Sequence, residues 1–82
     1  MFYLYIIKSL KTGEYYIGSS SNVEERLKQH NDGKVKSTKL LLPWQIIYTE
    51  SFTNRSVAVK RERQLKNWKS REAIERLIEK HL

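Results

Sequence analysis

Five side chains of this 82-residue chain have the chemistry to act on a phosphate group: Tyr5, Tyr16, Arg26, His30 and Glu62. Arg26 carries a forked, permanently charged donor suited to two oxygens of a phosphate. Glu62 offers hard oxygen ligands, and one carboxylate completed by water and substrate phosphate is a habitual arrangement for magnesium. A phenol titrates near about 10 and becomes a base only where cations lower its pKa, whereas an imidazole titrates near about 6.5 unaided. These residue types suit hydrolysis of a phosphodiester, which needs a deprotonated water and cations around the phosphate.

Each of the five also has an ordinary structural interpretation. A tyrosine in a strand commonly has a buried ring and a hydrated hydroxyl, a helical arginine is commonly solvated, and a histidine at a helix end interacts with the helix dipole. Glu62 is harder to explain in this way, because it interrupts an apolar stripe formed by Ala58 and Leu65. An acid on such a stripe needs a partner or a metal. Pairing with Lys66, four residues on, is the competing explanation.

Two strands are predicted to carry the tyrosines. Phe2–Ile7 is aromatic and branched, and its alternation gives apolar residues to both faces. A second strand is predicted over Glu14–Gly18, and the short link between the two favours an antiparallel hairpin that brings Tyr5 near Tyr16. The serine run 19–21 is expected to end this second strand.

A helix is predicted to hold the arginine and the histidine. Asn22 has the chemistry of an N-cap and approximates a capping box with Glu25. The helix is expected to run to about His30 and to stop at the sequence Asn-Asp-Gly of residues 31–33. Because Arg26 and His30 are four residues apart, they share a face of this helix.

The second half of the chain predicts one strand and two helices. The strand covers about Gln45–Phe52, and the first helix begins at Thr53–Asn54 and runs to about Trp68. Ser70 caps the last helix, whose inward stripe is Ile74, Leu77, Ile78 and His81. Trp44 and Trp68 are predicted to lie in the core rather than to stack on bases. The fold class is therefore α+β, with a three-stranded antiparallel sheet flanked by helices in the order β-β-α-β-α-α.

The chain resembles the GIY-YIG nuclease superfamily. The resemblance rests on Tyr3-Leu4-Tyr5, Tyr16-Ile17-Gly18, Arg26, His30 and Glu62 in that order, and it covers essentially the whole chain, residues 1–82, as one domain. The overall plan is similar to small single-domain bacterial members, which share their module with the incision subunit of nucleotide-excision repair. Two departures are that tyrosine and leucine replace the glycine and isoleucine of the first motif, and that no asparagine falls late in the last helix.

The resemblance implies a metal-dependent endonuclease that cuts DNA with low sequence specificity in DNA repair or processing. It implies that Tyr5 is the base, that His30 accepts or orients its proton, and that Tyr16 hydrogen-bonds water or phosphate. Arg26 matches the family arginine, and Glu62 matches the carboxylate that binds one divalent ion, Mg²⁺ or Mn²⁺. The alternatives are a catalytically weak or inactive nucleic-acid-binding module of the same fold and, with least support, a protein-interaction domain.

The composition favours a polyanionic partner. The formal net charge is +7 on 82 residues, which suits DNA and does not exclude RNA, although a solvated basic face is the alternative. The expected phosphate contacts are Lys34, Lys36 and Lys39 in a loop over residues 31–42, together with Lys60, Arg63 and Lys66 on the second helix and the neighbouring Arg61, Lys69 and Arg71. The polar half of that loop, with Lys34, Ser37, Thr38 and Lys39, is predicted to form a mobile lip for substrate. Without cysteine there is no disulfide partner, and without an apolar segment or signal peptide we expect a cytoplasmic protein.

Overall fold

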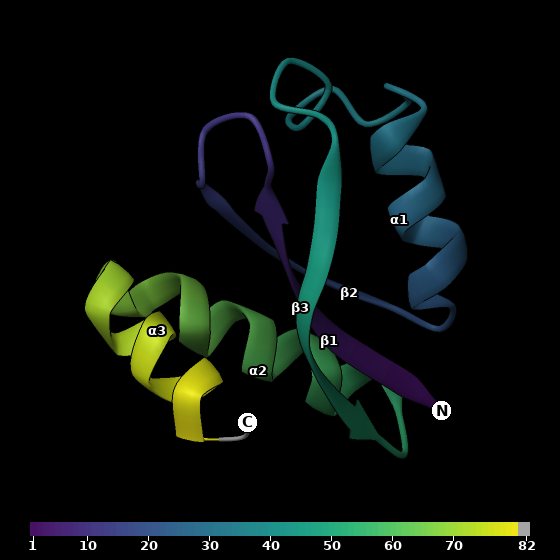
Figure 1. The fold of residues 1–82 in the computed structure, drawn as a ribbon. Helices are drawn as coiled ribbons and strands as arrows, with labels where there is room; N and C mark the ends of the chain where they lie inside the picture. Colours follow the sequence, from purple (N-terminus) through teal and green to yellow (C-terminus); the bar gives the residue numbers. More distant parts are fainter. Residues whose placement is uncertain (81–82) are drawn as a thin grey trace.

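The computed structural model describes residues 1–80 and contains three strands and three helices (Figure 1). The elements are β1 (Phe2–Ser9), β2 (Tyr15–Ser20), α1 (Val23–Asn31), β3 (Trp44–Phe52), α2 (Arg55–Trp68) and α3 (Arg71–Lys80). The strands form one antiparallel sheet in the order β2-β1-β3. The predicted α+β class and element order are confirmed. His81, which was assigned to the inward stripe of the last helix, lies outside the described residues.

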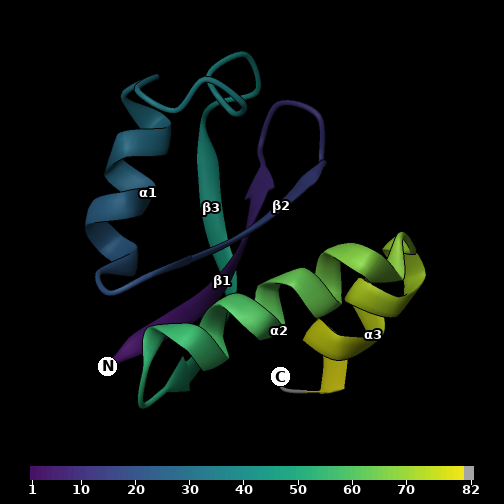
Figure 2. The same cartoon turned by 180° about the vertical axis from the view of Figure 1, so that it is seen from behind.

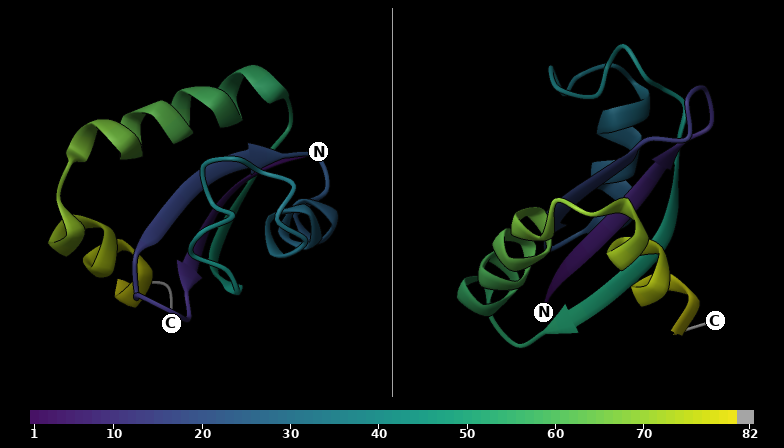
Figure 3. Two further views of the ribbon diagram at one scale, coloured as in Figure 1. Left: turned by 90° about the horizontal axis from the view of Figure 1, so that it is seen from above. Right: turned by 90° about the vertical axis from the view of Figure 1, so that its left-hand side faces the viewer.

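The sheet is covered on both faces, which explains why its central strand β1 is apolar from Phe2 to Ile7. In Figure 3, α1 lies on one face, whereas α2 and α3 lie on the other; Figure 2 shows α2 crossing the strands with α3 beside it. We call these the α1 face and the α2 face. The buried core residues are Tyr5, Ile7 and Trp44 on the α1 face, and Leu4, Ile6, Tyr48, Leu65 and Ile74 on the α2 face.

Strand β2 is longer than its composition predicts. Ser19 and Ser20 pair with Leu4 and Tyr3 of β1, so the serine run does not end the strand at Gly18. The ladder is made by backbone groups, which serine supplies as well as any apolar residue. This correction places Ser19 in the sheet, with its side chain toward α2.

Hydrogen bonds to Trp44 hold the end of α1 and the loop that follows it against β3. The side chain of Asn31 accepts from Trp44 N at 2.6 Å and donates to Trp44 O at 3.1 Å. The indole of Trp44 donates to the carbonyl of Thr38 at 3.0 Å. Thr38 is only 1% exposed, so it is a buried residue and does not belong to a polar lip.

The helix boundaries follow the predicted caps. Asn22 Oδ1 accepts from Glu25 N at 3.1 Å, and Ser70 Oγ accepts from Ala73 N at 3.2 Å. The prediction that Trp68 belongs to the core is wrong, because the buried residues of α2 are Ala58 and Leu65, whereas Trp68, in the last turn, is 36% exposed. Trp44, in contrast, is buried as predicted. No helix within residues 1–80 is long and apolar enough to cross a membrane.

Candidate active site

A chain of three hydrogen-bonded side chains lies under α1. The hydroxyl of Tyr5 is 2.9 Å from His30 Nε2, and His30 Nδ1 is 2.7 Å from Thr38 Oγ1. Thr38 donates its own hydroxyl to the carbonyl of Val35 at 3.4 Å, so it accepts the proton on Nδ1. His30 Nε2 then carries the lone pair, and the hydroxyl of Tyr5 donates to it. Thr38 therefore fixes the tautomer in which His30 faces Tyr5 as a base.

Burial keeps both members of this pair uncharged at neutral pH. Burial, and then the charge of Arg26, lower the pKa of His30 to about 4. Burial also raises the pKa of Tyr5 above its usual value, although a hydrogen bond from Arg26 opposes this shift. The resting pair is a neutral phenol that donates to a neutral imidazole.

Arg26 is a half-buried cation beside this pair. Its Nη1 donates to Gln29 Oε1 at 2.8 Å, and no carboxylate among the described residues forms an ion pair with it. A polar hollow of about 200 Å³ adjoins it, and its lining includes Ser20, Asn22, Gln29 and one acid, Glu25, which forms no ion pair with Arg26. Arg26 therefore presents a positive charge, without an ion-pair partner among the described residues, next to a space that an oxygen-rich group can enter.

Tyr16 lies on the same face as Tyr5 and His30. Its ring centroid is 5.1 Å from that of His30 in an edge arrangement, and the ammonium of Lys66 lies 5.8 Å from the same ring. The two tyrosines lie near each other as predicted, because both rings make edge contacts with His30, at 5.9 Å for Tyr5 and 5.1 Å for Tyr16. The ring of Tyr16 therefore contacts both His30, which belongs to α1, and Lys66, which belongs to α2.

Gly18 makes room for the hydroxyl of Tyr5. The two residues are paired across β1 and β2, and a Cβ atom on Gly18 would lie 2.5 Å from the Tyr5 hydroxyl oxygen. Real Cβ contacts are never this short, so any other residue would displace the phenol or the strand. Sequence reasoning gave Gly18 no role, although a glycine inside a strand is itself a signal that another group approaches closely.

Glu62 reaches the site from the α2 face. Its Oε1 accepts from Ser19 Oγ at 2.6 Å, and its Oε2 accepts from Lys66 Nζ at 2.6 Å. The side chain is 20% exposed, so the predicted pairing with Lys66 exists but the acid does not point into open solvent. Its charge raises the pKa of Tyr5. The five predicted residues therefore gather around edge strand β2, four on one face and Glu62 on the other.

The donor set around Glu62 suits a hard cation with few protein ligands. Within residues 1–80, no three His, Asp or Glu side chains gather into a metal cage. Magnesium commonly takes one or two carboxylates and completes its shell with water and substrate phosphate. Glu62, with the Ser19 hydroxyl against it, matches that pattern, and Lys66 is the group that a cation would compete with.

The predicted nucleic-acid contacts occupy two separate regions. All six are exposed, and they are Lys34, Lys36 and Lys39 in the loop after α1 and Lys60, Arg63 and Lys66 on α2. Loop and helix lie on opposite sides of the sheet (Figure 3). Lys66 alone among the six contacts the five predicted site residues within the described part of the chain.

Known proteins resemble this chain along nearly its full length. A family model described as the GIY-YIG catalytic domain matches residues 1–76. A UPF0213 protein of Staphylococcus saprophyticus is 36% identical over 78 residues, covering 94% of each chain. A UPF0213 protein of Bacillus licheniformis is 41% identical over 78 residues, covering 94% of this chain and 78% of its own. The solution NMR structure of a UPF0213 protein from Bacillus halodurans matches 96% of this chain and 84% of its own, with a TM-score of 0.59 and 32% identity.

Proposed function

This chain belongs to the GIY-YIG nuclease family, and we propose that it is an endonuclease that hydrolyses DNA phosphodiester bonds with the help of one divalent ion, Mg²⁺ or Mn²⁺. The observation that carries this proposal is the uncompensated Arg26 beside a tyrosine and histidine already joined by a hydrogen bond at 2.9 Å. A purely structural cluster would pair the arginine with an acid. Here the cation remains available for an anionic substrate.

The proton of the attacking water is transferred through Tyr5 and His30. The oxygen of Tyr5 takes a proton from water while the phenol passes its own proton to Nε2 of His30, so the net acceptor is the imidazole. A low pKa makes His30 a weak acceptor at rest, and one of its two causes is the charge of Arg26. A phosphate bound to Arg26 offsets that charge, so substrate binding strengthens the base.

The remaining residues hold the phosphate and its charge. The guanidinium of Arg26 binds non-bridging oxygens, and the phenol of Tyr16 hydrogen-bonds the water or the phosphate. Glu62 and Ser19 would provide the protein side of a metal site, and a divalent ion held there would supply positive charge for the phosphate and the leaving oxygen. Ser19 positions the carboxylate by donating to Oε1.

Low sequence specificity follows from the kind of contact the surface offers. Exposed lysines and arginines bind backbone phosphates, which fixes the position of the duplex without reading its bases. In the cell such an activity would serve DNA repair or processing. We propose DNA as the substrate, and the same contacts would accept RNA.

A second candidate function is a binding module of the same fold with weak or absent catalysis. The observation in its favour is that both oxygens of Glu62 are already engaged, one by Ser19 and one by Lys66. If Lys66 holds the carboxylate more firmly than a divalent ion does, nucleic acid binds without being cut.

Cleavage of plasmid and oligonucleotide DNA tests the two functions against each other. We expect cleavage that EDTA abolishes and that Mg²⁺ or Mn²⁺ restores. Arg26→Lys keeps the charge and loses the fork, and should slow cleavage by about tenfold or more. Arg76→Lys, an exposed arginine of α3, is the matched control and should cleave normally. Salt-sensitive binding without cleavage at any divalent ion would support the binding module instead.

A further inference from the structure

A basic groove lies beside the candidate active site, between edge strand β2 and the corner where α2 turns into α3. The cavity has a volume of about 440 Å³, and among the residues that line it are Tyr15, Tyr16, Lys66, Lys69 and Arg71. Tyr16 and Lys66 also belong to the candidate active site. The groove is therefore continuous with that site.

Lys69 is held at this groove in an unusual backbone conformation. It ends α2 with φ 48° and ψ 32°, and it is the only residue other than glycine within residues 1–80 that has a positive φ. Glycine is the usual residue at such a helix end, because a Cβ atom is disfavoured there. The side chain of Lys69 is exposed and makes no hydrogen bond or ion pair in the described chain. The lysine therefore adds backbone strain without an ion pair in the described chain, and it places a positive charge at the groove.

Arg71 is fixed against the opposite wall of the groove. Its guanidinium carbon lies 4.4 Å from the ring centroid of Tyr15, and its Nε is 3.7 Å from Glu75. The hydroxyl of Tyr15 donates to the same carboxylate at 3.1 Å. The ring and the carboxylate orient the guanidinium, which has five N–H donors to offer a ligand.

We propose that this groove binds the DNA strand that flanks the scissile phosphate, with the adjoining phosphodiester bound by Lys69 and Arg71. The inference rests on the proposed nuclease function. The lining of the groove contains three cations, Lys66, Lys69 and Arg71, and one acid, Glu14. Lys66 and Arg71 also pair with Glu62 and Glu75 outside the lining, at 2.6 and 3.7 Å, so Lys69 is the lining cation without an ion pair among the described residues. A groove whose lining is richer in cations than in acids suits a polyanion rather than a neutral ligand. Because Tyr16 and Lys66 are shared with the candidate active site, a strand in the groove continues directly into it. Phosphate contacts of this kind add affinity without sequence preference.

Lys69→Gly separates a binding role from a folding role. Glycine relaxes the left-handed backbone, so the variant should have a melting temperature equal to or above that of the wild type. Its affinity for a fluorescein-labelled single-stranded oligonucleotide, measured by anisotropy in EDTA, should nevertheless fall by about threefold to tenfold, and the dependence of log Kd on log salt should flatten by about one contact. Arg71→Gln should lose affinity similarly.

Matched controls remove one positive charge from α3, at residues outside the groove. Lys80→Ala is compared with Lys69→Gly, and Arg76→Gln is compared with Arg71→Gln, since both control residues are exposed and outside the lining of the groove. If all four variants bind the oligonucleotide equally well, or if the groove variants cleave DNA with an unchanged KM, the groove proposal is overturned while the nuclease function stands. If no variant or wild type cleaves DNA but only the groove variants lose binding, the nuclease function fails and the groove stands. Binding of poly-glutamate in place of the oligonucleotide would overturn the choice of nucleic acid.

Discussion

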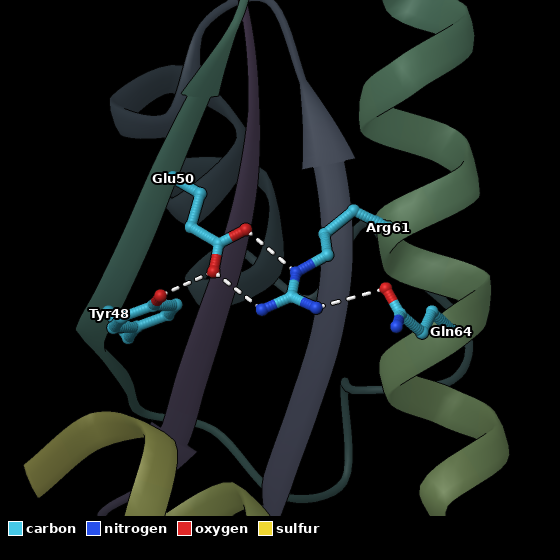
Figure 4. A network of polar contacts seen from close by, with 4 residues as sticks. All are labelled: Tyr48, Glu50, Arg61 and Gln64. Atoms are coloured by element: carbon cyan, nitrogen blue, oxygen red, sulfur yellow. Dashed lines mark hydrogen bonds and ion pairs between the residues drawn. The ribbon is translucent and has the colours of Figure 1, made fainter. Parts of the chain in front are cut away.

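Two polar clusters on opposite faces of the sheet contain the same kinds of residue, and they differ in how their charges are balanced. On the α2 face, Arg61 donates to both oxygens of Glu50 at 2.9 and 3.1 Å and to Gln64 at 2.9 Å, while the hydroxyl of Tyr48 donates to Glu50 (Figure 4). We call this the Glu50 network. On the α1 face, Arg26 contacts the neutral Gln29.

The difference separates a cluster whose charges balance one another in the folded protein from a cluster whose positive charge is balanced only when a ligand binds. In the Glu50 network burial and the carboxylate raise the pKa of Tyr48 to about 12, and the same carboxylate raises the pKa of Arg61. Each group there stabilises the charge state of its neighbour. In the candidate active site burial, and then the charge of Arg26, lower the pKa of the imidazole, which therefore stays neutral. The charge of Arg26 has no ion-pair partner among the described residues and is balanced only when an anion binds, as expected at a functional site.

Removing the two arginines should give opposite results, and this is the largest effect we expect. Arg26→Ala should lower the rate of DNA cleavage by about 100-fold to 1000-fold, since it removes a donor to the transition state, and should change the free energy of unfolding little. Arg61→Ala should leave the cleavage rate nearly unchanged and destabilise the fold by about 1–3 kcal/mol, because Glu50 loses its bidentate partner. Chemical denaturation and single-turnover cleavage measure the two quantities. Equal loss of stability in both variants would remove the distinction between the clusters.

Gly18→Ala should break the candidate active site without removing any of its reacting groups. The added methyl group would lie 2.5 Å from the hydroxyl oxygen of Tyr5, so the phenol must shift, and a displacement of about 1 Å can cost about 100-fold in rate. Overpacking should also cost about 1–3 kcal/mol of stability. Tyr48→Phe in the Glu50 network is the control, because it changes a buried tyrosine without touching the site. Normal cleavage by Gly18→Ala would show that the reaction does not depend on this position of the Tyr5 hydroxyl.

The dependence of stability on pH should reveal the buried imidazole. The folded-state pKa of His30 is about 4, below the unfolded value of about 6.5. The unfolded chain therefore takes up the proton first, so the stability from neutral His30 is complete above about pH 6.5 and is lost as pH falls toward about 4. The loss is on the order of 3 kcal/mol.

His30→Gln should abolish this part of the acid sensitivity, and His81→Gln should retain it. Unfolding by urea at several pH values between about 4 and 7 measures the difference. Identical slopes for the wild type and His30→Gln would mean that His30 is protonated as easily in the folded protein as in the unfolded chain.

Lys66→Met should produce the smallest effect, an increase in affinity for a divalent ion. The variant removes the ammonium from Glu62 Oε2, and because the lysine side chain is 48% exposed, the pair contributes at most about 1 kcal/mol, or about fivefold in affinity. Titration of metal-free protein with Mn²⁺, followed by electron paramagnetic resonance, measures binding independently of cleavage. Lys60→Met is the control. Weaker Mn²⁺ binding by Lys66→Met would identify Lys66 as a support for the metal site rather than a competitor.

The sequence predicts elements and residue types better than it predicts contacts between distant segments. The apolar alternation of β1 and the caps at Asn22 and Ser70 follow local rules, and they appear as expected. The hydrogen bond from Ser19 to Glu62 joins residues 43 positions apart, and its existence depends on the register of β2 and the placement of α2. Neither is encoded in a local pattern.

Two predictions from the sequence, for Thr38 and Trp68, are wrong for the same reason. Thr38 was assigned to a polar lip because its neighbours are polar, but the imidazole of His30 needs a partner for Nδ1, and the loop supplies Thr38. Trp68 was assigned to the core because it is large and aromatic, yet it lies in the last turn of α2, where Arg61 lies 5.7 Å from its ring centroid. In both cases tertiary contacts overrode residue type.

Side chains of β2 point alternately to the two faces of the sheet, and this limits where a residue can be inserted into the strand. Neighbouring residues of a strand point to opposite faces, so Tyr16 and Gly18 serve the α1 face while Ser19 serves Glu62 on the α2 face. Inserting one residue between Gly18 and Ser19 would turn the side chain of Ser19 away from Glu62, even if the sheet, the helices and every residue type were retained. The β1–β2 turn can vary in length at little cost, whereas the count of residues between the paired positions of β2 is fixed by the chemistry on its two sides.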